Sequence, residues 1–265
     1  MYITKLQNQG KINLSNYETI NQTCAASCVS ERYKFISTSQ VLAVLDDHGW
    51  QPVKVTESGT RIPEKKGFQK HAITLANARF STEIDVGGTL PRLVLTNSHS
   101  GCSAFTFHIA LMELVCSNGL MVSTGDQSFR VTHNNYADLA VEQTLSYILN
   151  GLIQALKDAE RYRSIILTEF ERQRFAKEAI AMRWDGEKYS IDTDHVLRAR
   201  RRSQNDKTLW NTFNVVQESI IKGGIWQKGK NNKITRSRPI RGIDQSIKLN
   251  KKLWLAMETL AEKKG

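Results

Sequence analysis

The stretch AFTFHIALMELVCSNGLMVS, residues 104–123, places two apolar runs on either side of Ser117-Asn118-Gly119. Asn-Gly between apolar runs is the strongest short-range signal for a β-hairpin, because both residues accept a positive φ. The pattern predicts strands at 104–116 and 120–123, joined by a tight turn. This hairpin is the clearest indication of an antiparallel sheet in the first half of the chain.

Further apolar and β-branched runs flank the hairpin. Residues 51–56, 69–76 and 90–96 precede it, and residues 129–133 follow it. Sequential strands that are joined by short links imply a largely antiparallel sheet.

The chain before this sheet is expected to hold less regular structure. The first 30 residues are rich in Asn, Gln, Ser and Thr, which predicts an irregular segment. Residues 33–37 alternate as a strand does. A short helix at 41–48 would be capped by Thr38 or Ser39 and ended by Gly49.

After about residue 137 the apolar residues follow the period of a helix. Thr168, with Glu171 three positions later, is a capping box for a helix that reaches about Trp184. Two more apolar stripes, at 209–220 and 243–263, predict two further helices. The face of the first helix consists of Val141, Leu145, Ile148, Leu149, Leu152 and Leu156.

Strands first and helices second indicate an α+β fold, with a mainly antiparallel sheet in the N-terminal half followed by a packed set of helices. We expect an irregular segment over residues 1–30 and a single α+β domain over residues 31–265. That domain would be sheet-rich at 31–136 and helical at 137–265.

The charge of the chain is concentrated in one segment. The 265 residues carry a net charge of +11, but residues 1–195 hold 20 Lys and Arg against 21 Asp and Glu. Residues 196–241, the basic segment, hold 12 against 2. A neutral body with one strongly basic segment indicates a surface that binds a polyanion.

The composition, 40% hydrophobic and 24% charged, is typical of a globular protein. No apolar run approaches the roughly 20 residues that span a bilayer, and the first ten residues do not resemble a secretory signal. The four cysteines, Cys24, Cys28, Cys102 and Cys116, are too few for a disulfide scaffold. They predict reduced thiols in a cytoplasmic protein that has no membrane partner.

No metal site and no cofactor are expected. Cys24 and Cys28 have the spacing of a loose zinc knuckle, but Cys102 and Cys116 do not make a second pair. The chain also lacks the glycine-rich phosphate loop that would hold a nucleotide.

No catalytic residue is expected either, so a binding protein is favoured over an enzyme. Ser98 and His99 are adjacent, and adjacent strand residues point to opposite faces, so they are not automatically a nucleophile and its base. Asp192 and Asp194 lie before a helix, where acidic residues favour the helix dipole. The alternative left open is a metal-dependent nuclease that uses His71, His99 or such acid pairs.

The basic segment predicts a nucleic-acid site. Gly223, Gly224 and Gly229 predict a flexible loop that becomes ordered on a nucleic-acid backbone. Trp226 in that loop is the candidate for stacking on unpaired bases, whereas Trp210 lies in an apolar stripe and is expected in the core. The alternative is that these charged side chains only keep a helical surface hydrated and bind no ligand. The expected binding residues are Arg198, Arg200, Arg201, Arg202, Lys222, Trp226, Lys228, Lys230, Lys233, Arg236, Arg238 and Arg241.

A second patch precedes the expected strand at 69–76. Lys65, Lys66 and Lys70 surround Phe68 and add to the expected nucleic-acid-binding residues. This patch could share a groove with the basic segment, or it could be a hairpin loop with Phe68 under the sheet.

Several motifs occur in one order along the chain and together resemble the phage- and plasmid-encoded family called domain of unknown function 932. The resemblance extends from about Arg32 to Ala261. It implies a mobile-element origin and supplies no catalytic residues. The motifs are Arg32-Tyr33 and residues 66–71, 95–101, 115–120, 209–218, 222–224, 236–238 and 249–254.

Together these observations predict a phage- or plasmid-type protein in the bacterial cytoplasm that binds nucleic acid, with single-stranded DNA preferred. No recognition-helix motif or zinc finger is present, and a basic loop with aromatic residues suits exposed bases. Recombination or strand annealing, in a homo-oligomeric ring or filament, is the expected setting. The alternative partner is a host protein, with the chain acting as an inhibitor of a host defence system.

Overall fold

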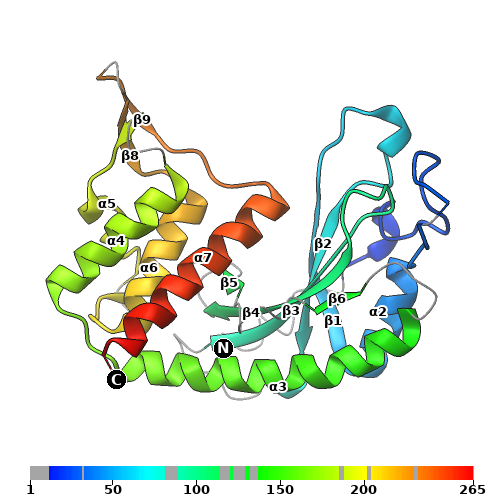
Figure 1. Cartoon of the computed structure of the whole chain (residues 1–265), viewed down its shortest axis with the longest axis horizontal. Helices are drawn as coiled ribbons and strands as arrows, with labels where there is room; N and C mark the ends of the chain where they lie inside the picture. The colour runs from blue at the N-terminus through cyan, green and yellow to red at the C-terminus, as the bar shows by residue number, and fades with distance from the viewer. Residues whose placement is uncertain are drawn as a thin grey trace. The chain divides into compact units, whose positions relative to one another are not determined.

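A computed structural model gives the fold of the chain (Figure 1). It describes residues 12–31, 33–80, 89–113, 120–121, 129–131, 137–184, 188–201, 204–229 and 232–264, with the side chains of 112–143 excepted. The chain divides into two compact units, and each is described by itself. The first consists of Met1–Ile84, Leu90–Ala110 and Thr124–Leu152, and the second of Asp85–Thr89, Leu111–Ser123 and Ile153–Gly265.

Strands dominate the N-terminal half and helices follow, so the α+β class is confirmed. The sheet has the order β1 (Trp50–Glu57), β2 (His71–Asn77), β3 (Thr89–Asn97), β4 (Phe105–Glu113), β5 (Leu120–Met121), and β6 (Phe129–Val131) pairs with β4. The pairs β1–β2, β2–β3 and β4–β6 are antiparallel. Each of the six lies where the sequence predicted a strand, while the turn at Ser117-Asn118-Gly119 lies outside the described residues.

One face of β2 and β3 carries an apolar row. Ile73 lies opposite Leu95, and Leu75 lies opposite Leu93. All four side chains are fully buried. His71 and Asn97 form the next pair in the same register, so the row continues into polar residues at one end.

α2 (Thr38–Asp47) begins three residues earlier than predicted. Ser37, and not Thr38 or Ser39, is its N-cap, because the Ser37 Oγ accepts the Gln40 N–H at 3.3 Å. Residues 33–37 were expected to be a strand, and that prediction is wrong. The segment instead leads into the helix, with the Tyr33 hydroxyl donating to the Ser98 carbonyl at 2.8 Å.

Residues 12–31 hold one short turn, η1 (Leu14–Asn16), and are otherwise irregular. Thr19, Ile20 and Ala26 are nonetheless buried. Two further turns, η2 (Pro63–Lys65) and η3 (Ala78–Phe80), lie on either side of β2.

α3 (Ala137–Ser164) confirms the first long helix, and its residues are divided between the two units. Leu145, Ile148 and Leu152 are buried as predicted, but Leu149 is 36% exposed. Positions three and four apart stay on one face, so the buried row continues through Ala155 and Ala159 and passes Leu149 by. Among the described residues, no helix is both long and apolar enough to cross a membrane.

The second unit contains α4 (Glu169–Arg183), α5 (Thr193–Leu197), α6 (Leu209–Lys222) and α7 (Ile243–Glu262). The predicted capping box is present at the start of α4, because the Thr168 Oγ1 accepts from Glu171 N and Glu171 accepts from Thr168 N.

Aromatic rings form the core of this second unit. Trp210 is 1% exposed and Phe213 and Trp254 are fully buried, as the stripes in α6 and α7 predicted. The ring centroids of Phe213 and Trp254 lie 6.0 Å apart in an edge-to-face arrangement, and those of Tyr162 and Trp254 lie 5.8 Å apart.

The loop expected between α6 and α7 is instead part of a small sheet. β8 (Trp226–Gly229) pairs with β9 (Ile234–Arg236) on one side and with β7 (Tyr189–Ser190) on the other, both antiparallel. Figure 1 shows β8 and β9 side by side as a hairpin. The expected flexible glycine- and lysine-rich loop was therefore wrong over these seven residues.

Candidate nucleic-acid interface

The outer face of the small sheet carries one aromatic ring, one aliphatic side chain and two cations. Trp226 lies opposite Arg236, and Lys228 lies opposite Ile234. Opposed residues, and residues two apart along a strand, share a face, so these four side chains lie together. All four are exposed, Trp226 to 44% and Ile234 to 63%. They are called the outer-face cluster below.

Arg236 holds the ring of Trp226. The guanidinium carbon lies over the indole, 4.5 Å from the ring centroid. A guanidinium at this distance is attracted to the ring quadrupole, which orients the indole while leaving much of it in solvent.

The inner face of the same sheet is polar and packed. The Gln227 side chain accepts from Trp184 Nε1 at 3.0 Å and donates to Thr235 Oγ1 at 3.3 Å. Trp184 is the C-cap residue of α4, so these bonds fix the hairpin to the end of that helix. Arg183, the residue before it, donates to the Arg238 carbonyl and strengthens the attachment.

Gly223 lets two backbones approach, and the backbone of Gly224 is hydrogen-bonded, so the two glycines do not form a flexible loop. Gly223 has φ +67°, and a Cβ on it would lie 2.7 Å from the carbonyl oxygens of Ser237 and Arg238. The Gly224 N–H donates to the Ser237 carbonyl at 2.8 Å, and Ser237 N–H donates to the Ile225 carbonyl at 2.9 Å. The base of the hairpin is thereby closed by hydrogen bonds.

Two of the predicted phosphate-binding residues pair with a buried carboxylate. Glu218, 1% exposed, accepts from Arg201 Nη1 at 2.7 Å and from Arg201 Nη2 at 3.0 Å. Lys222 Nζ lies 2.7 Å from the same carboxylate. Arg200 Nη2 donates to the Gly223 carbonyl at 3.0 Å. These three basic side chains therefore fasten the segment to α6 and its end.

Five other predicted cations are exposed and make no ion pair with any described residue. Lys233 is also exposed, with contacts of its own. Arg202 and Lys230 lie outside the described residues. The five are Arg198, Lys228, Arg236, Arg238 and Arg241.

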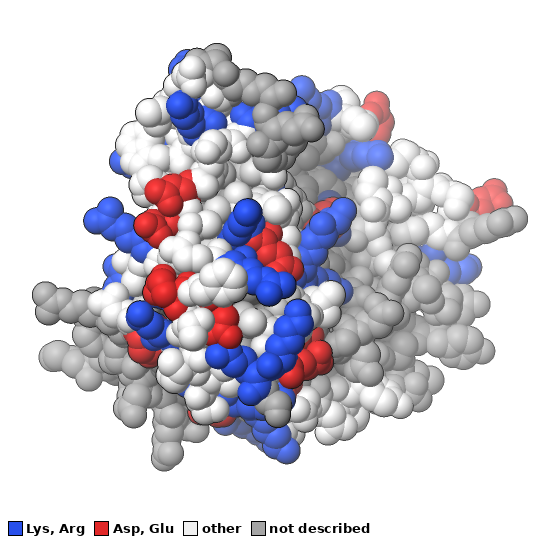
Figure 2. Space-filling view, turned by 60° about the vertical axis from the view of Figure 1, so that its left-hand side comes forward, with Lys and Arg blue, Asp and Glu red and all other residues white. Residues whose placement is uncertain are grey.

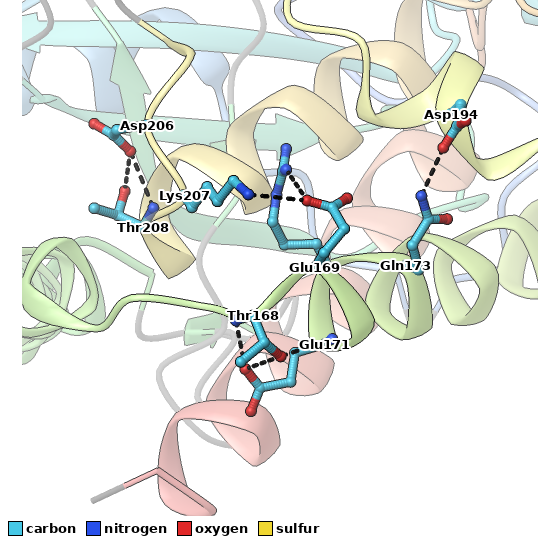
Figure 3. Close-up of polar contacts among 9 residues, drawn as sticks. Thr168, Glu169, Glu171, Gln173, Asp194, Asp206, Lys207 and Thr208 are labelled. Carbon is cyan, nitrogen blue, oxygen red and sulfur yellow. Dashed lines mark hydrogen bonds and ion pairs between the residues drawn. The ribbon is translucent and has the colours of Figure 1, made fainter.

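The cations near the start of α4 behave differently. Arg172 Nη1 and Lys207 Nζ both lie close to Glu169 Oε2, at 2.9 and 3.4 Å (Figure 3). Lys264 Nζ lies 2.9 Å from Glu171 Oε1. Figure 2 shows the same mixture of blue and red side chains over much of the face drawn. Lys207 belongs to the basic segment itself, and cations elsewhere in the unit are also exposed without an ion pair to any described residue, so the basic segment stands out by its density of charge, with 12 Lys and Arg against 2 Asp and Glu. Those elsewhere include Arg174, Lys177, Lys248, Lys252 and Lys263.

Asp192 and Asp194, the acidic residues named for catalysis, have structural partners, and so does the nearby Asp206. Asp192 caps α5 by accepting Asp194 N–H at 3.0 Å, and Asp194 accepts from Gln173 Nε2 at 2.6 Å (Figure 3). Asp206 accepts from the Thr208 hydroxyl at 2.6 Å.

The second predicted patch belongs to the first unit. Lys66 is exposed, Lys65 and Lys70 are half-buried, and Lys65 Nζ donates to Cys102 Sγ at 3.4 Å. The hydrogen bonds from Ser100 and from Lys65 lower the pKa of the Cys102 thiol.

The two histidines named for the nuclease alternative are fully buried. His71 Nε2 lies 2.9 Å and His99 Nε2 3.2 Å from the Thr38 Oγ1, which also accepts from Asn97 Nδ2 at 3.0 Å. Among the described residues, no group of three or more His, Cys, Asp or Glu is placed to hold a metal ion.

The hydrogen bonds of His71 and His99 determine which nitrogen of each ring carries the proton. His71 Nδ1 lies 3.3 Å from the Gln69 carbonyl, which can only accept, so Nδ1 carries the proton and Nε2 accepts from Thr38. The single hydrogen of the Thr38 hydroxyl is then used, and His99 must donate to it. Burial lowers the pKa of His71 to about 4. The hydrogen bond to the Gln69 carbonyl and the charge of Glu57 both raise this pKa, but by less than burial lowers it.

Several polar residues of α6 turn out to support the core. Asn214 Nδ2 donates to the Trp210 carbonyl at 2.9 Å, and Gln217 Nε2 donates to Asn250 Oδ1 at 2.9 Å. Asn214 and Gln217 are 5% and 2% exposed, so neither presents its amide to a ligand.

Sequence reasoning missed Ile234 as a member of the interface. The sequence offered little signal, because only the first residue is apolar in Trp226-Gln227-Lys228 and in Ile234-Thr235-Arg236, which falls short of the alternation of a strand. Both stretches are short and lie among glycines, lysines and asparagines, which suggested a loop instead.

Comparisons with known proteins give a family and no activity. A family model described as "Domain of unknown function (DUF932)" matches residues 25–254. The "UPF0380 protein YfjQ" of Escherichia coli (strain K12) is 30% identical over 238 residues, 87% of this chain and 83% of that protein. The "UPF0380 protein YafZ" of the same organism is 31% identical over 233 residues, again 87% and 83%. No solved structure matches the chain.

Proposed function

This chain belongs to the family described as a domain of unknown function (DUF932), and we propose that it binds nucleic acid, with single strands preferred. The ligand would lie on the second unit, over the unpaired cations of the basic segment. Neutralisation of phosphates would supply most of the affinity, because the released counterions favour binding in dilute salt.

The observation that carries this proposal is the set of five unpaired, exposed cations. Arg198, Lys228, Arg236, Arg238 and Arg241 have no acidic partner among the described residues, and their segment holds 12 Lys and Arg against 2 Asp and Glu. Like charges that are left together on a surface repel one another, which costs stability unless a polyanion offsets it. The charge therefore favours a polyanionic partner over simple solvation.

The wider setting is part of the proposal. The protein would act in the bacterial cytoplasm, in a cell that carries a phage or a plasmid, and would serve recombination or strand annealing. The curated relatives are bacterial, which supports the host but not the process. Assembly into a homo-oligomer would let neighbouring copies follow one strand.

The test is fluorescence anisotropy of labelled single- and double-stranded oligonucleotides against salt concentration. If about 4 to 6 phosphates are neutralised on a single strand, log K should fall with log salt with a slope of about −3 to −4. A triple variant, Lys228→Glu, Arg238→Glu and Arg241→Glu, should lose both the binding and most of the salt dependence. Arg201 and Lys222 are left unchanged because Glu218 needs them.

The matched control changes three exposed helical lysines outside the basic segment: Lys177→Glu, Lys248→Glu and Lys252→Glu. It alters the net charge by the same amount and should weaken binding far less. Equal losses in the two variants would mean that only net charge matters. No binding by the folded wild-type protein in low salt would remove nucleic acid and leave an acidic host protein as the better partner.

A further inference from the structure

We propose that the outer-face cluster is a base-stacking subsite, in which one unpaired base of a nucleic-acid strand lies on the Trp226 ring beside Ile234. Lys228 would meet the adjoining phosphate, and Arg236 would hold the indole from its other side. The inference rests on the proposed function and adds that the bases are bound as well as the backbone.

The small sheet turns polar side chains toward the protein and apolar side chains toward solvent, the reverse of the usual arrangement. Gln227 and Thr235 take the packed inner face, while Trp226 and Ile234 face solvent. A register shift of one residue would exchange the two faces, so burial alone would favour the opposite arrangement. Exposed apolar side chains on a face rimmed by cations indicate a binding surface.

Trp226 differs from the other tryptophans of the chain in its exposure. Trp226 is 44% exposed, and no other tryptophan is more than 8% exposed. The hydrogen bonds at Gly223, Gly224 and Ser237 hold the base of its hairpin, so the ring is presented on a fixed element. A pre-positioned ring loses little conformational entropy when a ligand stacks on it. The other four are Trp50, Trp184, Trp210 and Trp254.

The outer-face cluster suits a strand with unpaired bases better than a duplex. A base in a duplex has both faces covered by its neighbours, whereas an unpaired base offers a face to an aromatic ring. The cluster combines such a ring with Lys228 and lies in a segment with 12 Lys and Arg against 2 Asp and Glu. A strand with unpaired bases and a phosphate backbone complements both features. A protein partner would need an acidic patch beside an apolar contact to satisfy both, whereas every nucleotide of a single strand carries a phosphate next to its base.

The experiment separates base contacts from backbone contacts. Two labelled 12-mers of equal charge are compared: oligo-dT, and an abasic strand that keeps the phosphates and lacks bases. The full-length protein is titrated in low salt as the wild type, as Trp226→Ala and as Trp226→Phe. Phe170→Ala, which removes a 76%-exposed aromatic ring from α4, is the matched control.

The wild type and Phe170→Ala should bind oligo-dT roughly 5- to 150-fold more tightly than the abasic strand, the range expected for one stacked base. Trp226→Ala should lose that ratio and keep the wild-type affinity for the abasic strand, while Trp226→Phe should keep part of the ratio. Oligo-dT should also quench the tryptophan emission of the wild type.

Two results would overturn the subsite and leave the proposed function standing. One is equal affinity of the wild type for oligo-dT and the abasic strand. The other is an unchanged ratio in Trp226→Ala, with far-UV circular dichroism showing a folded variant. No binding of any 12-mer by the wild type would remove the proposed function together with the subsite.

Discussion

Glu218 and Arg201 form a two-point ion pair, with nitrogen–oxygen distances of 2.7 and 3.0 Å between the guanidinium and a carboxylate that is 1% exposed. Lys222 reaches the same carboxylate from one turn along α6. Arg201 and Lys222 together compensate the buried charge of Glu218. These two cations of the basic segment therefore stabilise the fold and are not free to bind a ligand.

Removal of the Glu218 charge should therefore destabilise the protein strongly. We expect Glu218→Gln to lower the free energy of unfolding by about 3 kcal/mol, the low end for breaking a buried pair, because both cations keep some solvent. Urea denaturation measures the change. Glu169→Gln, which breaks the pairs that Arg172 and Lys207 make with a 52%-exposed carboxylate, is the control and should cost about 1 kcal/mol or less. Similar losses in both variants would contradict the role given to Glu218.

Gly223→Ala and Gly224→Ala should differ although both positions have positive φ. A positive φ costs an alanine about 1 kcal/mol at Gly224, whereas the φ of +67° and ψ of −148° at Gly223 are open almost only to glycine. At Gly223 the new Cβ would also lie 2.7 Å from two carbonyl oxygens, while at Gly224 it meets nothing within 4 Å. We expect a loss of more than about 2 kcal/mol at Gly223 and about 1 kcal/mol at Gly224. Equal denaturant midpoints would show that the approach at Gly223 relaxes without cost.

The first unit should lose stability in mild acid. The pKa of His71 is about 4 in the folded protein and 6.5 in the unfolded chain, so the unfolded chain binds the proton first. The stabilisation is complete above pH 6.5 and falls as the pH drops from there to about 4, by about 3 kcal/mol in all. A proton on His71 Nε2 would also leave the Thr38 hydroxyl with three donors around it.

Denaturation at a series of pH values tests this dependence. His71→Gln should be less stable than the wild type at pH 7 and should show a flatter profile between pH 6.5 and 4.5, because its amide does not titrate. A wild-type profile that is already flat over this range would mean that water reaches the imidazole.

Cys102 should react faster with an alkylating reagent when Lys65 is present. Hydrogen bonds from Ser100 and Lys65 favour the thiolate, which is the reactive form. We expect Lys65→Met to slow alkylation of Cys102 about two- to fivefold at pH 7.5. Mass spectrometry of the labelled peptides reports the rate, and Cys24 and Cys28 on the same chain act as internal controls.

Much of the fold could be predicted because each signal was local. The six strands of the large sheet follow short apolar runs, and the capping box at Thr168 and Glu171 marks the start of α4. Gly49 was predicted to end α2, and it follows the helix with a φ of +81°. These signals depend on neighbours in the sequence and need no knowledge of tertiary contacts.

The interface could be predicted only in part, because its geometry depends on residues far apart in the sequence. Gly223 and Gly224 suggested flexibility, but Ser237 and Arg238 occupy the space that a side chain at Gly223 would fill, and the Gly224 N–H donates to the Ser237 carbonyl. Nothing in the sequence distinguishes Arg201 from the arginines next to it, because its partner Glu218 lies 17 residues further along the chain. Trp226 was identified correctly as exposed, since it lay outside every apolar stripe.

The hydroxyl of Thr38 joins the first turn of α2 to the ends of β2 and β3, through His71, Asn97 and His99. If α2 moved away, two imidazoles and an amide would lose their partner in a site closed to water, which is costly for each of them. Partial detachment is therefore disfavoured, and the helix and the two strands should open as one cooperative unit. Amide protons in all three elements should then exchange with solvent at a common rate, although up to 61 residues separate the groups that meet at this one oxygen.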